Sequence, residues 1–240
     1  MTATRGLPLL SIELGGAPLS ASAAQSVVAV RVRQRLSLPS LCEVTLADPP
    51  PEIWRAPTPL PGASLRLTAR ERSEPLFTGE IAAIEHVFEG TQGRMVRMRG
   101  YDVLHRLGKR QPVRGHVQVT APDLLRELVS DIGLRVSATE TGPVWPRVMQ
   151  YDQTDLELVA ELCERSGLYF TVRDDVVHVL SLEGIGEALP IALGATLLEA
   201  RIEVNGATTC RAVSTMAWDP LRGAPHRGRS EEHTSELQSP

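Results

Sequence analysis

Between Leu9 and Tyr101, apolar and polar residues alternate along the chain, and this alternation limits what the chain can fold into. Apolar residues occupy every second position in four runs: Val28, Val30 and Val32; Cys42, Val44 and Leu46; Leu65 and Leu67; and Val96 and Met98. Successive side chains of a strand point to opposite faces, so these runs predict strands with one buried face and one wet face. Residues 1–110 are therefore expected to form a first small antiparallel β-barrel.

A proline-rich segment interrupts the alternation. Six prolines lie between positions 49 and 61 and surround Trp54. Proline has no backbone N–H to donate to a neighbouring strand, so a central strand is excluded here. We expect an extended loop on the barrel.

The pattern changes from period two to a helical spacing after Arg110. Thr120 with Asp123 and Thr154 with Glu157 each resemble the capping box that begins a helix, and Gly133 and Gly167 follow at the expected ends. After the second helix, residues 168–172 and 176–180 are rich in β-branched and aromatic side chains and flank Asp174-Asp175, which predicts a hairpin. Residues 111–185 are thus expected to form a small α/β insert with two short helices and a hairpin.

The last part of the chain begins a second set of strands. Residues 197–204 and 210–217 are predicted strands, and Asn205-Gly206 is the turn between them. Two strands cannot close a barrel, so residues 186–228 are expected to be the start of a second, truncated barrel whose remainder follows Gly228. Residues 229–240 resemble a translated sequencing adapter and are set aside as an artefact.

Composition excludes several classes of function. The 25 basic and 29 acidic residues are mixed along the chain, and aromatic residues make up only 4% of it. A broad cationic face and a base-stacking platform are both missing, which argues against direct nucleic-acid binding. The apolar stretch at residues 7–10 is too short for a signal peptide or a membrane span, so membrane insertion is not expected.

The cysteines predict neither a metal site nor a disulfide framework. Cys42, Cys163 and Cys210 are isolated from one another, with no C-x-x-C pair and no histidine at ligand spacing. We expect small buried hydrophobic side chains of a protein made in the reducing cytoplasm.

The histidines do not form a convincing catalytic constellation. His86 is expected on the polar face of a strand, His178 lies inside the predicted hairpin, and Asp102 with His105 could form an acid/base pair. Because no nucleophile motif such as G-x-S-x-G accompanies that pair, each histidine is interpreted as a surface or packing residue. No catalytic, cofactor-binding or metal-binding residue is predicted, and the protein is not expected to be an enzyme.

Three further patterns have simple structural interpretations. Asp174-Asp175 is a turn, and Glu231-Glu232 lies in the adapter-like tail, so neither is a glycosidase carboxylate pair. The segment 184–186 lacks the spacing of a dinucleotide or P-loop motif. The basic stretch formed by Arg106, Lys109, Arg110 and Arg114 has no interleaved aromatics, which favours a solvated face or a subunit contact.

Three segments in order resemble a known family: FTGEI at residues 77–81, RGYDVLHRL at 99–107, and residues 150–170, which begin with QYDQTDL and end with GLYF. Together they resemble the phage late-control protein D family, the baseplate hub of contractile tails, related to the N-terminal hub portion of the type VI secretion spike protein VgrG. The resemblance spans roughly residues 7–217.

That resemblance implies a fold and an assembly. The expected fold is mainly β with an α+β insert: two tail-tube-like antiparallel β-barrels, the second incomplete here, joined by a small α/β domain. The expected function is a structural hub that connects a tail tube protein to a spike protein as a homotrimer. It would be cytoplasmic during assembly and then part of a virion tail or injection particle.

The competing hypothesis is a tail-associated cell-wall-degrading or glycan-binding module. A lysozyme-type site needs a buried glutamate beside aromatic and apolar groups, and no segment has that composition. A glycan-binding barrel would predict clustered exposed tryptophans, whereas Trp54, Trp145 and Trp218 are far apart in the sequence.

Overall fold

The computed structural model describes residues 10–55, 60–69, 74–89, 93–173, 175–182, 187–201, 212–219 and 222–231. The chain divides into two units, Met1–Gly186 and Glu187–Pro240. Each unit is described by itself below.

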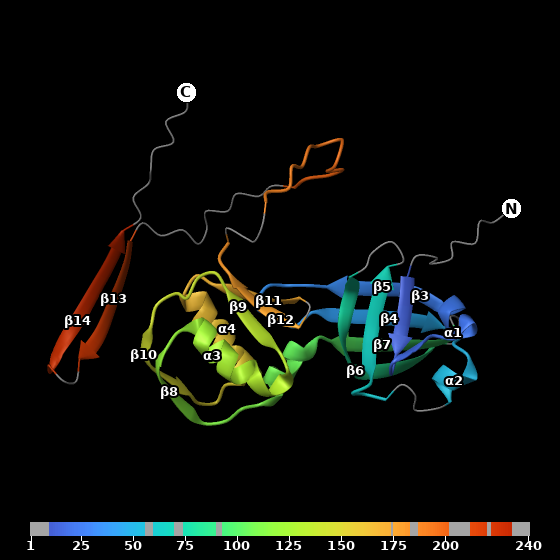
Figure 1. Ribbon diagram of the computed structural model, residues 1–240, viewed down its shortest axis with the longest axis horizontal. Coiled ribbons are helices and arrows are strands. Elements are labelled where there is room, and N and C mark those ends of the chain that lie inside the picture. Colours follow the sequence, from blue (N-terminus) through green and yellow to red (C-terminus); the bar gives the residue numbers. More distant parts are fainter. Residues whose placement is uncertain are drawn as a thin grey trace. The chain divides into compact units, whose positions relative to one another are not determined.

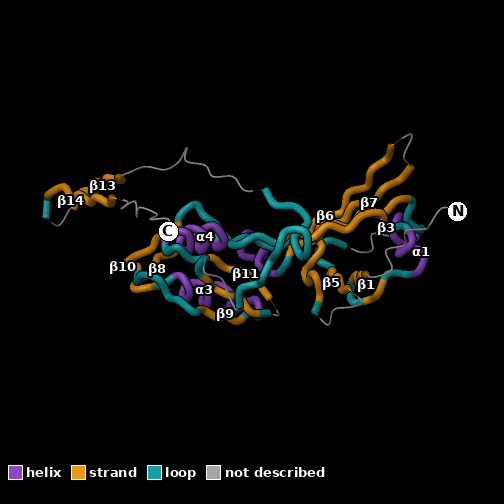
Figure 2. Tube along the Cα trace, turned by 90° about the horizontal axis from the view of Figure 1, so that it is seen from above, coloured by secondary structure: helices purple, strands orange, loops and turns teal. Residues whose placement is uncertain are grey.

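The first unit begins with a seven-stranded antiparallel sheet in the order β2-β1-β5-β6-β7-β4-β3 (Figure 1). Its strands are β1 (Leu10–Leu14), β2 (Ala17–Pro18), β3 (Val27–Arg33), β4 (Leu41–Ala47), β5 (Ser64–Ala69), β6 (Pro75–Glu89) and β7 (Gly93–Tyr101). The four alternating runs of the sequence all lie in these strands, so the strand predictions are confirmed. The predicted buried face is wrong at Val28, which is 58% exposed because the pairing of β3 with β4 shifts register between Val27 and Ala29. Figure 2 shows the long β6–β7 hairpin projecting beyond its neighbouring strands.

One face of this sheet encloses an apolar core. The fully or nearly buried side chains are Ile12, Cys42, Val44, Leu46, Leu65, Leu67, Phe77, Ile81, Val96 and Met98. Residues of β1 and β3 both line a groove of about 130 Å³, but the two strands do not pair with each other. The fold class is therefore mainly β with antiparallel sheets, and closure into a barrel is not observed among the described residues.

Two short helices occur where the sequence predicted none. α1 (Ala21–Gln25) begins at Ser20, whose hydroxyl accepts a hydrogen bond from the backbone N–H of Ala23. α2 (Pro51–Trp54) lies inside the proline-rich segment that was expected to be an extended loop. Proline fits the first turn of a helix because the N–H that it lacks has no helical partner there, so the prolines permit α2. Residues 56–59 of that segment lie outside the described residues.

The rest of the first unit mixes helices and strands. Its elements are the 3-10 helices η1 (Val103–Lys109) and η2 (Ser130–Ile132), the helices α3 (Ala121–Val129) and α4 (Asp155–Arg165), and the strands β8 (Arg114–Val119), β9 (Arg135–Ala138), β10 (Trp145–Gln150), β11 (Tyr169–Arg173) and β12 (Val176–Leu180). The predicted N-caps Thr120 and Thr154 are both confirmed, the latter as a complete capping box with Glu157. The predicted hairpin is β11–β12.

α3 and α4 pack between two small sheets. β12 pairs with β11 on one side and, in parallel, with β9 on the other, whereas β8 and β10 form a separate two-stranded ribbon. Figure 1 shows this ribbon curving past the helices. One core joins all these layers and includes Leu124 from α3, Val159 from α4, Val148 from the ribbon and Phe170 from β11. The sequence did not predict β8, β9 or β10.

The second unit contains a hairpin, β13 (Ala212–Asp219) paired with β14 (Ala224–Glu231). β13 overlaps the predicted strand 210–217, but its partner β14 was not predicted, because its sequence has no alternating apolar pattern. Residues 197–201, the described part of the predicted strand 197–204, do not form a strand and contain only an isolated bridge between Leu197 and Leu193. The predicted turn Asn205-Gly206 and Cys210 lie outside the described residues. The division of the chain into a barrel, an insert, a truncated barrel and an artefact stays a prediction.

Candidate functional site

The candidate functional site is a groove of about 700 Å³ in the first unit, where the seven-stranded sheet meets the β11–β12 hairpin. Asp102, which directly follows β7, lines the groove and is buried. The Asp102 carboxylate accepts hydrogen bonds from the backbone N–H groups of Ser40 (2.7 Å) and Leu104 (3.0 Å), the second of which caps η1. Burial raises the pKa of the Asp102 carboxyl above its ordinary value, and these hydrogen bonds oppose that shift.

The predicted pairing of Asp102 with His105 is present, but its geometry does not suit acid/base catalysis. Nδ1 of His105 lies 2.7 Å from the backbone carbonyl oxygen of Asp102, and Nε2 lies 3.9 Å from a carboxylate oxygen of Glu80. The Asp102 carboxylate itself is directed to Ser40 and Leu104. A general base must share a proton with its partner, and here the carboxylate and the imidazole are held apart by different backbone groups.

Both positively and negatively charged side chains line the groove. Arg66, Arg106 and Arg173 are its cationic residues, and Glu74, Glu80 and Asp175 are acidic residues on its wall. Arg106 forms an ion pair with Glu80. A groove with this mixed charge suits contact with a polar protein surface better than selective binding of an anion or a cation.

His86 and His178, the two other histidines considered in the sequence, lie in strands. His86 lies opposite the buried Val96 on β7, and its ring meets that of Trp54 edge-on at 5.2 Å. The His86 side chain is itself exposed, in keeping with the predicted surface position. His178 is opposite Thr171 within β11–β12, as the hairpin prediction required.

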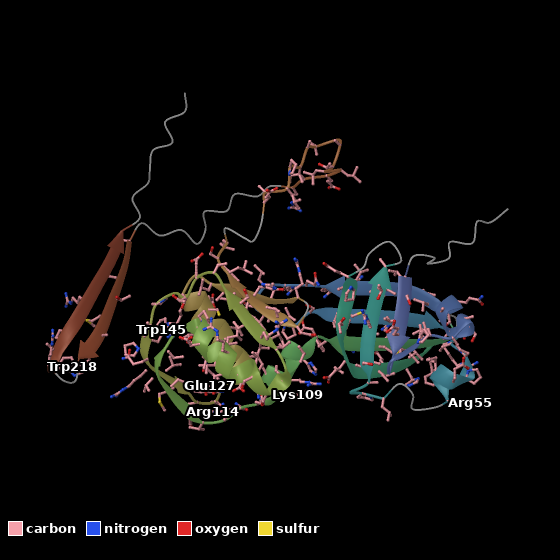
Figure 3. All side chains as sticks on the ribbon, viewed as in Figure 1. Arg55, Lys109, Arg114, Glu127, Trp145 and Trp218 are labelled. Atoms are coloured by element: carbon pink, nitrogen blue, oxygen red, sulfur yellow. The ribbon has the colours of Figure 1, made fainter. Side chains whose placement is uncertain are left out.

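The basic stretch is only partly a solvated face. Lys109 and Arg114 are exposed (Figure 3), but Arg110 is drawn into the fold. Nε of Arg110 lies 2.9 Å from Oδ2 of Asp155, a side chain with no exposed surface, although the two groups are not aligned as a hydrogen bond. Arg110 also donates to Oδ2 of Asp131 (2.6 Å) and to the carbonyl of Leu128. The interpretation of Arg110 as a surface residue is wrong, because these acceptors lie far from it in the sequence.

Cys42 and Cys163 are buried free thiols, as the sequence predicted. Burial raises the pKa of each thiol to about 12. Since the thiolate is the reactive form, we expect neither to react with an aromatic disulfide reagent at pH 8 while the chain is folded. The measurement uses a Cys210→Ser variant, in which only these two cysteines remain. Both should react once denaturant is added, and rapid reaction of either before that point would contradict the prediction.

Among the described residues, no group of three or more His, Cys, Asp or Glu side chains is arranged to hold a metal ion. The described helices are all too short or too polar to cross a bilayer. The absence of catalysis and of a cofactor stays a prediction.

Solved structures with a similar fold include tail proteins and a component of the type VI secretion system. The prophage MuSo2 43 kDa tail protein from Shewanella oneidensis aligns with 96% of this chain and 70% of its own length, with a TM-score of 0.67 and 13% identity. The tail protein from Neisseria meningitidis MC58 aligns with 95% of this chain and 68% of its own, with a TM-score of 0.63 and 15% identity. The E. coli c3393 protein, a component of the type VI secretion system, aligns with 76% of this chain and 52% of its own, with a TM-score of 0.56 and 16% identity.

The chain therefore has the fold of phage tail proteins. It belongs to the family described as the Alg8 N-terminal domain, whose model matches residues 5–238. No curated protein matches the chain.

Proposed function

We propose that this protein is the structural baseplate hub of a contractile phage tail or a phage-derived injection system, and that it connects the tail tube to the spike as a homotrimer. The observation that carries the proposal is the fold shared with the prophage tail protein of Shewanella oneidensis over 96% of the chain. The resemblance of residues 77–81, 99–107 and 150–170 to late-control protein D supports the finer assignment to a hub.

The seven-stranded sheet supports a role in assembly. Among the described residues, β3 pairs only with β4, so one edge of β3 keeps unpaired backbone groups. An open edge is a place where a strand of another chain can add. Val28, on this edge strand, is 58% exposed. In the proposed hub, the edges of this sheet pair across subunits.

A lysine at Val28 is expected to weaken the trimer, because a charged side chain on an edge strand disfavours pairing with another chain. Sedimentation equilibrium of the full-length protein at micromolar concentration measures the effect as a lower trimer fraction than in the unchanged protein. Leu60→Lys is the matched control, since Leu60 is 56% exposed but lies in a turn outside the strands. A monomer of the unchanged protein, both alone and with its tube and spike partners, would contradict the proposed hub.

A further inference from the structure

The β8–β10 ribbon has an outward face that is more apolar than an ordinary protein surface. Val113, Val117, Met149 and Tyr151 are 66–75% exposed. Val117 is opposite Arg147, and Met149 is opposite Gly115, while Val113 and Tyr151 adjoin the two strands at their common end. Clustered exposed apolar side chains of this kind mark interaction sites. Methionine and tyrosine are also enriched in the cores of protein interfaces.

The opposite face of the ribbon is already used by the fold. His116 and Val148 are opposite each other and buried against the helices, and a carboxylate oxygen of Glu127 of α3 lies 3.3 Å from Nδ1 of His116. Gln118 has a positive φ of 51°, and this local twist turns the next residue, Val119, into the core. The inward face therefore packs the ribbon against α3 and α4, and the outward face remains exposed.

The outward face is too small to hold a second copy of this chain in a stable dimer. Each strand has six residues, so at about 3.3 Å per residue and about 4.8 Å between strands the face measures about 20 by 10 Å. That area of about 200 Å² is a quarter of the roughly 800 Å² per partner that a stable protein complex buries. A dimer held by this face alone would not be stable. A short segment of a protein that is already bound elsewhere in the assembly can bind to an area of this size.

The charge on the face indicates the chemistry of that segment. Arg147 is the charged residue among the outward positions of the two strands, and it forms no ion pair with the described residues. An apolar partner surface with a carboxylate opposite Arg147 would bury the apolar side chains and pair the guanidinium.

We propose that the outward face of the β8–β10 ribbon is a docking site for a short segment of a different protein of the assembly, with an apolar stripe and an acidic residue that meets Arg147. The identity of the partner as a protein of the assembly rests on the proposed function. The exposure of the apolar face does not depend on that function.

The first test uses the anionic apolar dye anilinonaphthalene sulfonate, whose rings and sulfonate imitate the two features of the segment. A Val117→Lys/Met149→Lys variant is expected to bind the dye about tenfold more weakly than the unchanged protein. Leu36→Lys/Leu38→Lys is the control, because those leucines are exposed (42% and 46%) but lie outside the ribbon. Equal loss in both variants, or no loss in either, overturns the docking site. Circular dichroism shows whether each variant is folded.

The second test places a photoreactive amino acid at position 117 of the protein within purified particles. Crosslinks to a different polypeptide, at a peptide with apolar residues and a carboxylate, support the docking site. Crosslinks to a second copy of this chain, or none while position 28 does crosslink, overturn it. If the protein is not found in any particle, the proposed function fails, and the dye experiment still decides whether the face binds an apolar anion.

Discussion

Replacement of Arg110 by leucine is expected to lower the free energy of unfolding of the first unit by about 3–5 kcal/mol. The physical reason is that Asp155 has no exposed surface and would keep a buried charge without its cation, which lies 2.9 Å away in the unchanged protein. The carbonyl of Leu128 at the end of α3 and the carboxylate of Asp131 would also lose a donor. Urea denaturation followed by circular dichroism measures the loss.

Two further variants show how much of the lost stability comes from the unpaired buried charge and how much from removing an arginine side chain. Arg126→Leu removes a partner from the exposed ion pair with Asp123, which has an N–O distance of 2.6 Å, and should cost no more than about 1 kcal/mol. Adding Asp155→Asn to Arg110→Leu removes the unpaired charge, so part of the stability should return. If Arg110→Leu cost as little as Arg126→Leu, the ion pair with Asp155 would not stabilise the fold.

Local patterns in the sequence predicted the local structure well. The alternation in residues 28–46 and 65–98 predicted strands because a single buried face imposes period two on the side chains. Thr154 and Glu157 predicted the start of α4 because both partners of a capping box lie within four residues of each other. In each case the residues that determine the structure are neighbours in the sequence.

The features that the sequence did not predict depend on distant residues or on local exceptions. Asp102 caps η1 and also bonds to Ser40, which is 62 residues away, and nothing near Asp102 indicates that second role. In β8 the positive φ of Gln118 interrupts the alternation, and Pro146 in β10 is a residue that sequence patterns count against a strand. The ribbon and its exposed face were missed for these reasons.

The candidate site at Asp102 shows the same contrast between what neighbouring residues predict and what distant residues determine. The sequence brought Asp102 and His105 to attention through their spacing, but the roles of the two residues depend on Ser40, Leu104 and Glu80. A spacing of three residues is compatible with a catalytic pair and with a helix cap, and only the hydrogen bonds separate the two. Here they define a structural junction between the sheet and the helical part of the unit.

Phe170 connects the seven-stranded sheet region and the helical part of the first unit, through its backbone as well as its ring. The ring is completely buried in the core that α3, α4 and β12 share. Its carbonyl accepts a hydrogen bond from the backbone N–H of Ser37 (2.7 Å), in the loop between β3 and β4. A cavity at this position would therefore remove apolar contacts next to the hydrogen bond that joins the β3–β4 loop to β11.

Phe170→Ala is expected to lower the free energy of unfolding by about 3–5 kcal/mol, because the core can close only partly around the space that the ring leaves. If that variant does not fold, Phe170→Leu keeps most of the volume and should cost about 1 kcal/mol. Phe88→Ala is the control, since Phe88 is 70% exposed and makes one aromatic contact, with Trp54 at 4.9 Å, which corresponds to about 1 kcal/mol. Urea denaturation of all three variants should rank Phe170→Ala as the most damaging. A smaller loss than in Phe88→Ala would mean that this core does not hold the first unit together.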